Sequence, residues 1–186
     1  MSSDPSDVRA ALERGTVDEV VQMLDPGEAA SWTDGHRPAL ALALQNRSPA
    51  DRLAIAHLLL DRGADAGFVL GRDRVGALHI LFSHEPHDFA AEGVLATRLM
   101  DCGADPNLVS ARFGSPLATL AAAFKYTDQT LQPFYTALID SGRLDLDTVD
   151  KGGRTMLENI AVKVTRRQSL YDQLRALPPN TSRGPR

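Results

Sequence analysis

Strongly apolar blocks that each stop at a glycine dominate the pattern of hydrophobic and polar positions along this chain. The stretch LAIAHLLLDRG (53–63) is an apolar block followed by a charged pair and Gly63. A glycine placed just after an apolar helix suits the left-handed C-terminal position, where a side chain would clash with the backbone. Two further blocks end at Gly103 and Gly142, so we predict three helices that stop at these glycines.

A second, shorter kind of helix is predicted upstream of these blocks. Ser115 and Thr155 supply hydroxyl groups suited to a helix N-cap, and Pro38 and Pro116 suit the first helical turn. The stretch LATLAAAF (117–124) that follows is rich in alanine, which fits a crowded helix face. Neither kind of helix could bury its apolar stripe alone, whereas stacked neighbours could.

Both landmarks return at a constant interval. Gly63, Gly103 and Gly142 stand 40 and 39 positions apart. The tetrapeptides RPAL, GALH, SPLA and TMLE begin at positions 37, 76, 115 and 155, at intervals of 39, 39 and 40. A period that two independent landmarks keep over four units indicates an internal repeat. We therefore predict an all-α solenoid of about five stacked helix-pair units.

The repeated motifs resemble those of the ankyrin repeat family. The resemblance spans roughly residues 8–177 and implies an ankyrin-repeat solenoid, in which His79 hydrogen-bonds the loop backbone. The residues that carry it are Gly-Ala-Asp at 63–65, Gly-Ala-Asp-Pro-Asn at 103–107, Leu78-His79, Ser115-Pro116-Leu117, and the pattern Asp150, Gly153, Thr155.

The chain departs from the ankyrin pattern in its period. Units here are about 39 residues long, where ankyrin units have about 33. The extra residues lie between the two helices of each unit, in QNRSPADR, SHEPHDFAAEG and KYTDQTLQ. These inserts are either longer helices or longer loops on the side away from the turns.

The period divides the chain into one repeat domain over residues 1–177 and a disordered tail over 178–186. We expect Arg166, Arg167, Gln168, Asp172, Gln173 and Arg175 to give the last unit a solvated outer face, as a terminal cap requires. The expected units are an N-terminal cap at about 8–27, three units at about 32–65, 71–105 and 110–145, and a C-terminal cap at about 150–177.

Composition narrows the class of protein. A formal net charge of −4 does not favour a nucleic-acid binder, which would usually be basic. Cys102 is the only cysteine, which excludes an internal disulfide and favours a reducing, intracellular setting. The N-terminus has no apolar signal region, and the apolar runs are too short for a membrane span. We predict a monomeric cytoplasmic protein with no nucleic-acid or membrane partner.

The segment HEPHD (84–88) is a candidate for metal chemistry. Two imidazoles and two carboxylates within five residues could ligate a transition metal. The alternative is a solvated polar loop, which we favour because no second cluster completes a coordination shell. We predict no metal ligands and no cofactor, and keep a metal- or small-molecule-responsive regulator using 84–88 as the alternative function.

Nucleophilic catalysis is not supported by the sequence. Cys102 falls at a helix end, where it fits a packed thiol better than a reactive one. Ser115 fits an N-cap and lacks the Gly-x-Ser-x-Gly frame of a nucleophile. The glycine-bounded segment GRDRVG (71–76) matches a turn better than a phosphate loop. We therefore predict that the protein is not an enzyme.

The turn tips between units are the predicted binding surface. Trp and Arg are enriched in binding hot spots, and in ankyrin proteins the tips and the adjacent first-helix face form a concave partner surface. A competing interpretation is that Phe68, Leu70, Leu108 and Val109 only pack between neighbouring tips. The predicted partner-binding residues are Trp32, Phe68, Arg72, Arg74, Arg112, Phe113 and Lys151.

These observations together predict a function in binding. A free-standing array with no catalytic motif would act by occupying a surface of another protein. We predict a non-enzymatic protein–protein interaction module, working as an adaptor or as a stoichiometric inhibitor such as an immunity protein. A preformed face would keep the ordering cost of such binding low.

Overall fold

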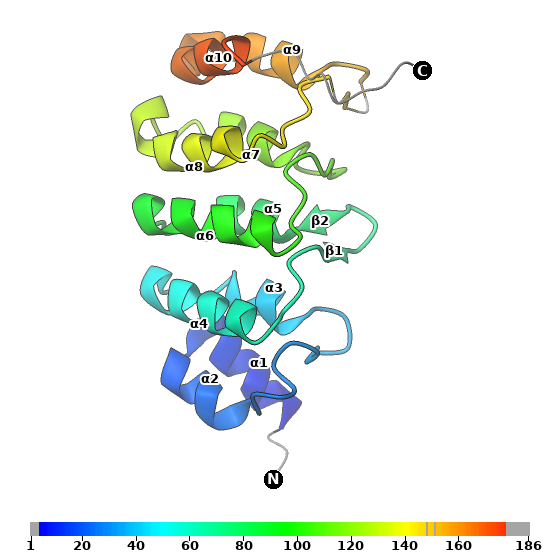
Figure 1. Ribbon diagram of the computed structural model, residues 1–186, viewed down its shortest axis with the longest axis vertical. Coiled ribbons are helices and arrows are strands. Elements are labelled where there is room, and N and C mark those ends of the chain that lie inside the picture. The colour runs from blue at the N-terminus through cyan, green and yellow to red at the C-terminus, as the bar shows by residue number, and fades with distance from the viewer. Residues whose placement is uncertain (1–3, 148, 151, 178–186) are drawn as a thin grey trace.

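The protein is a stack of helices with almost no sheet. The computed structural model describes residues 4–147, 149–150 and 152–177, and within these ranges the helices lie in successive layers along the long axis (Figure 1). The prediction of an all-α fold is confirmed at this level. The helices are α1 (Pro5–Arg14), α2 (Val17–Met23), α3 (Ala39–Ala43), α4 (Pro49–Asp61), α5 (Ala77–Ser83), α6 (Phe89–Asp101), α7 (Pro116–Ala122), α8 (Asp128–Asp140), α9 (Met156–Ala161) and α10 (Gln168–Arg175), with a 3-10 turn η1 (Val164–Arg166).

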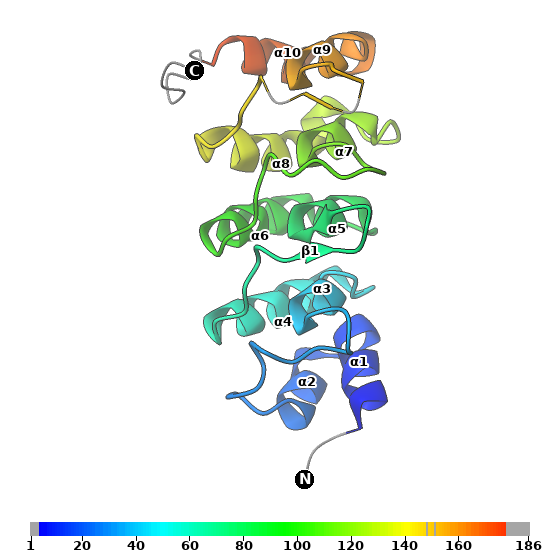
Figure 2. The same cartoon turned by 90° about the vertical axis from the view of Figure 1, so that its right-hand side faces the viewer.

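The helices form two rows. Helices α1, α3, α5, α7 and α9 contact one another in that order, and we call them the first row. Helices α2, α4, α6, α8 and α10 do the same and form the second row. Each layer pairs one helix from each row, as Figures 1 and 2 show from two sides. The leucine- and alanine-rich core runs continuously between the rows, from Val8 to Leu174.

Local chemistry places most helix ends where the sequence predicts them. Gly63, Gly103 and Gly142 follow α4, α6 and α8 with φ of 84°, 107° and 63°, so the predicted left-handed glycines are confirmed. The hydroxyls of Ser115 and Thr155 accept N-cap hydrogen bonds, also as predicted.

One prolyl prediction fails. Pro116 begins α7, but Pro38 lies one position before α3, in extended backbone with ψ of 155°. Its carbonyl accepts the first hydrogen bonds of the helix, from Ala41 and Leu42.

The inserts between paired helices are partly helix and partly loop. The second-row helices α4, α6 and α8 each have 13 residues, whereas α3, α5 and α7 have 5, 7 and 7. The side chains of Ser48, Asp88 and Thr127 cap the longer helices at their N-termini. Each insert therefore supplies a short loop and the first turn of the second helix.

A buried arginine links the first three layers. Arg52 is 0% exposed and ion-pairs with Glu92 of the third layer. Its guanidinium also donates to the carbonyls of Asn46 (3.0 and 2.9 Å) and Pro86 (3.0 Å). The Asn46 amide in turn donates to the carbonyls of Leu12 and Gly15 in the first layer, at 3.1 and 2.9 Å.

His87 extends this network toward the fourth layer. Its Nδ1 lies 2.6 Å from the second carboxylate oxygen of Glu92, and its side chain is 2% exposed. The ring packs against Phe89, Tyr126 and Phe134, with centroids 5.0, 5.9 and 5.5 Å away. The expectation of a solvated loop at 84–88 is therefore wrong for His87, because its ring fills an aromatic space between layers.

Arg167 also departs from the sequence prediction. It is 1% exposed, so its assignment to a solvated cap face is wrong. Its guanidinium donates to the carbonyls of Ala121 (3.1 Å), Ala123 (2.7 Å) and Tyr126 (3.1 Å). These carbonyls lie at and beyond the end of α7, where the helix leaves acceptors without intrahelical partners. Arg167 supplies hydrogen-bond donors to these carbonyls and so connects the last layer to the fourth.

Two earlier predictions fall outside the described ranges: the tail 178–186 and Lys151. Over the residues that are described, no helix is both long and apolar enough to span a bilayer.

We expect Arg52→Ala to lower the free energy of unfolding by about 3–5 kcal/mol, because it leaves Glu92 buried without its cationic partner. The double change Arg52→Met, Glu92→Leu should lose less, since no uncompensated charge remains. Urea unfolding followed by circular dichroism measures both. Arg98→Ala is the control: its pair with Asp61 is exposed, and such pairs contribute about 0–1 kcal/mol. Equal losses for Arg52→Ala and Arg98→Ala would refute the role of the buried pair.

Candidate functional site

Each of the four later layers projects a turn beyond the ends of its helices, and we call these turns the tips. In the third layer the tip is a hairpin of β1 (Val69–Leu70) and β2 (Val75–Gly76). Single bridges close the others: Thr33 with Pro38, Ser110 with Gly114, and Val149 with Thr155. Figure 1 shows the hairpin standing away from the helix stack at one edge.

Hydrogen bonds join the tips of the third and fourth layers. The carbonyl of Asp73 accepts from the Ala111 amide and from the Ser110 hydroxyl, each at 2.8 Å. A side chain at one tip position therefore keeps its distance to side chains at the next. A surface built in this way loses little conformational entropy on binding.

His79 holds the base of the same two tips. Its Nδ1 accepts from the Gly76 amide at 3.2 Å, so Nε2 carries the proton and donates to the Gly114 carbonyl at 2.9 Å. Burial lowers the pKa of His79, in keeping with a neutral ring that needs Nδ1 as an acceptor. The prediction that His79 hydrogen-bonds the loop backbone is confirmed.

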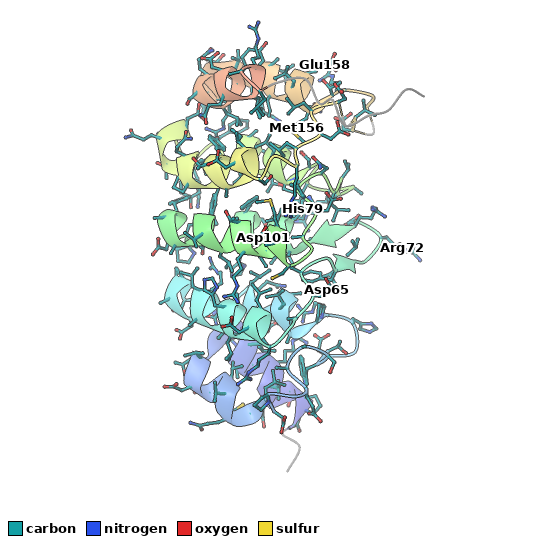
Figure 3. All side chains as sticks on the ribbon, viewed as in Figure 1. Asp65, Arg72, His79, Asp101, Met156 and Glu158 are labelled. Atoms are coloured by element: carbon teal, nitrogen blue, oxygen red, sulfur yellow. The ribbon has the colours of Figure 1, made fainter. Side chains whose placement is uncertain are left out.

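Three of the predicted arginines lie exposed on this rigid edge. Arg72 and Arg74 belong to the hairpin tip and Arg112 to the next one. Figure 3 shows Arg72 at the far end of the hairpin, pointing away from the stack. No carboxylate in the described part of the chain forms an ion pair with any of the three. The edge is thus positive on a chain whose net charge is −4.

The predicted aromatic residues are less available than the arginines. Phe113 is half-buried between the His79 ring, 6.2 Å away between centroids, and the Arg112 guanidinium, 5.0 Å from its centroid. Trp32 and Phe68 are half-buried and pack against the core. Leu108 is 7% exposed, as the competing packing interpretation of the tips predicts.

A groove that the sequence analysis missed lies beside Phe113, between α7 and α9. It has a volume of about 240 Å³ and a mostly apolar floor of Ala118, Ala122, Met156 and Ile160. Arg112 and Lys163 lie on its rim. The signal in the sequence was the pair of alanines one helical turn apart, which leaves room beside α7.

Among the described residues that line the groove, the carboxylate of Asp150 is already engaged. Asp150 accepts from the amides of Gly152 (2.7 Å) and Arg154 (3.1 Å) and from the Asn159 side chain (2.9 Å). These hydrogen bonds, with that of Asn159 first, lower the pKa of Asp150. The groove therefore presents apolar surface with free cations rather than free acids.

The residues considered for metal binding and for nucleophilic catalysis make structural contacts. Within the described ranges, no group of three or more His, Cys, Asp and Glu side chains is arranged to hold a metal ion. His87 of the HEPHD segment is engaged with Glu92, and Cys102 is half-buried against the core. The Ser115 hydroxyl accepts from the Ala118 amide at 3.2 Å, as an N-cap does.

Comparisons with known proteins bear on the fold alone. No model of a protein family matches the chain, and no curated protein matches it. Among solved structures, that of a functionally unknown protein from Leptotrichia buccalis C-1013-b is similar, with a TM-score of 0.63 and 19% sequence identity. The match covers 92% of this chain and 96% of the other. At this identity the likeness establishes a shared fold.

We expect the free energy of unfolding to fall as the pH drops from about 7.5 to 5.5. Burial lowers the pKa of His57, His79 and His84 in the folded protein. The unfolded chain therefore takes up protons first as the pH passes about 6.5, and unfolding is favoured at lower pH.

Urea titrations at several pH values measure this dependence. The fully buried His79 changes the free energy of unfolding by at most about 1.4 kcal/mol per pH unit. His79→Gln should weaken the dependence, since an amide can accept from Gly76 and donate to Gly114 without titrating. An identical slope in wild type and variant would contradict the assignment.

Proposed function

We propose that this protein is a divergent ankyrin-like repeat protein that binds another protein through its tips and first-row face. The proposal rests on the recurrence of the same contacts along the stack. Arg98 pairs with Asp61, 37 positions away, and Arg143 with Asp101, 42 positions away. Separations near the sequence period are what stacked repeats require, since each unit contacts its neighbours.

The positive tip edge beside the groove is the observation that carries the binding function. Arg72, Arg74 and Arg112 have no acidic partner in the residues described, and Arg112 also borders the apolar groove. Arginine beside an apolar pocket is a common composition of binding hot spots. Hydrogen bonds from the Ala111 amide and the Ser110 hydroxyl to the Asp73 carbonyl join the tips of the third and fourth layers, so the partner would meet a surface that is already ordered.

The role we infer is non-enzymatic. Ser115 and His79, which would be candidates for a nucleophile and a base, both use their polar atoms in capping and tip hydrogen bonds. Occupying a partner's surface is sufficient for an adaptor or for a stoichiometric inhibitor such as an immunity protein. We place the protein in the cytoplasm, because its single cysteine, the half-buried Cys102, favours a reducing compartment. We keep the prediction that it is a monomer.

The alternative role, a regulator that responds to a ligand through segment 84–88, has one observation in its favour. His84 lines a large polar pocket beside α1. His87 is buried against Glu92 and is not among the residues that line this pocket. The observation favours a small-molecule ligand over a metal ion.

We expect Arg72→Ala, Arg74→Ala, Arg112→Ala to bind its protein partner at least about 100-fold more weakly, because hot-spot arginines contribute about 2 kcal/mol or more each. Pull-down from lysate of the source cell, read by mass spectrometry, would identify a stoichiometric partner. Calorimetry with the purified partner then gives the affinities. Ala122→Glu, which fills the groove and adds a negative charge, should weaken binding independently.

The matched control variant loses the same number of positive charges, at positions outside the tips. Arg98→Ala, Arg143→Ala, Arg175→Ala removes three exposed or half-buried second-row arginines and should bind as the wild type does. Circular dichroism confirms that each variant is folded. A partner held equally by the tip variant, the groove variant and the wild type would refute this surface.

A further inference from the structure

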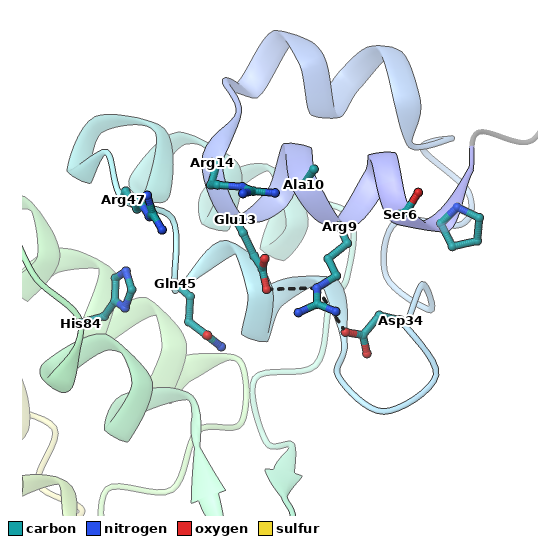
Figure 4. Close-up of a pocket in the computed structure, with 10 residues that line it drawn as sticks. Ser6, Arg9, Ala10, Glu13, Arg14, Asp34, Gln45, Arg47 and His84 are labelled. Carbon is teal, nitrogen blue, oxygen red and sulfur yellow. Dashed lines mark hydrogen bonds and ion pairs between the residues drawn. The ribbon is translucent and has the colours of Figure 1, made fainter.

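A cavity larger than the groove beside α7 lies at the other end of the first row. It has a volume of about 660 Å³, within the range of small-molecule sites. One wall is α1, and the opposite side is formed by Gln45 and Arg47 after α3 and by His84 after α5 (Figure 4). The tip residue Asp34 closes one end. This pocket is separate from the groove beside α7.

The acidic side chains of the pocket are neutralised within the protein. Glu13 pairs with Arg9 at 3.3 Å and with Arg37 at 3.2 Å. Asp34 pairs with Arg37 at 2.9 Å and lies 4.0 Å from Arg9. Two carboxylates and two guanidiniums thus form a closed group, and Figure 4 shows the Arg9 side of it.

Two further guanidiniums in the same pocket have no such compensation. Arg14 and Arg47 line it, are exposed, and form no ion pair with any carboxylate among residues 4–147, 149–150 and 152–177. Two like charges in one concave site repel, and an anion between them would convert the repulsion into attraction. Guanidinium groups also bind phosphate and carboxylate oxygens with paired hydrogen bonds.

His84 also lines the pocket, and one of its ring nitrogens has no hydrogen-bond partner. The Nε2 of His84 is buried and has no hydrogen-bond partner. A buried polar atom left unpaired is unfavourable, and a ligand that reaches it recovers that loss. Burial, with the Arg52 guanidinium next in importance, lowers the pKa of His84, so the ring is neutral at neutral pH and can donate from one nitrogen.

We propose that this pocket binds a small molecule carrying an oxyanion group, phosphate or carboxylate, between Arg14 and Arg47, with His84 as a third contact. The neutral side chains of Ser6 and Gln45 line the remainder and can hydrogen-bond the rest of such a ligand. This site is independent of the tip surface proposed for a protein partner. It assigns a function to three side chains that the fold does not use.

The test is calorimetric titration of the full chain with two probes, pyrophosphate for a phosphate group and citrate for a carboxylate group, in chloride buffer at neutral pH. We expect saturable one-to-one binding of at least one probe, and the probe that binds identifies the anion. Arg14→Gln, Arg47→Gln should weaken binding at least about tenfold, the size of one charge-assisted hydrogen bond. Arg47→Gln alone should give a smaller loss.

The control variant separates a built site from general charge attraction. Arg72→Gln, Arg74→Gln removes the same charge at the tips and should bind the probe as the wild type does. His84→Leu should weaken binding and His84→Gln, which retains an N–H donor, should restore part of it. In the wild type, the His84 ring proton resonances should shift on titration.

Two results would overturn the proposal. One is that neither probe saturates at up to about 10 mM, which is weaker than any specific site of this charge would be. The other is that the pocket variant and the tip variant bind the probe equally weakly, which would mean that the probe is attracted by the general positive charge of arginines. Neither result affects the proposed protein partner, whose test uses the tip and groove variants.

Discussion

The buried guanidinium of Arg52 determines how neighbouring layers of this protein are positioned relative to one another. The leucines between the two rows favour contact in any rotation, because the hydrophobic effect is not directional. Arg52 requires specific partners, since a charge in the core is costly unless it is both paired and hydrogen-bonded. Its partners, Asn46, Pro86 and Glu92, lie in two layers, and Asn46 reaches a third. The network therefore sets the rotation and spacing of three successive layers.

The spacing of the layers determines the geometry of the tips. The Asp73 carbonyl can accept from the Ala111 amide and the Ser110 hydroxyl only when the third and fourth layers stand at the right distance. Arg167 plays the equivalent part at the other end, where it holds α10 and the end of α7 together. The groove between α7 and α9 depends on that attachment. The geometry of the tips and of the groove thus depends on charged residues buried in the stack.

Local signals predicted the helices well and the buried charges poorly. Gly63, Gly103 and Gly142, and the caps Ser115 and Thr155, act through atoms within a few residues, so their roles could be inferred from the chain. Arg167 and His87 look solvated in the sequence, because polar side chains usually are. Their burial follows from acceptors and rings that neighbouring layers supply.

The tip arginines were predicted as candidates, but not the groove beside Phe113 nor the pocket at Arg14 and Arg47. By itself, the sequence determined where helices begin and end and the interval at which the pattern repeats, since these depend on hydrogen bonds within one or two turns. Only the tertiary structure decided which charges are buried, which are left unpaired and where the first row is hollow. Those properties arise between side chains in neighbouring layers, about 40 positions apart in the sequence. Such side chains meet only once the layers have stacked at a particular rotation.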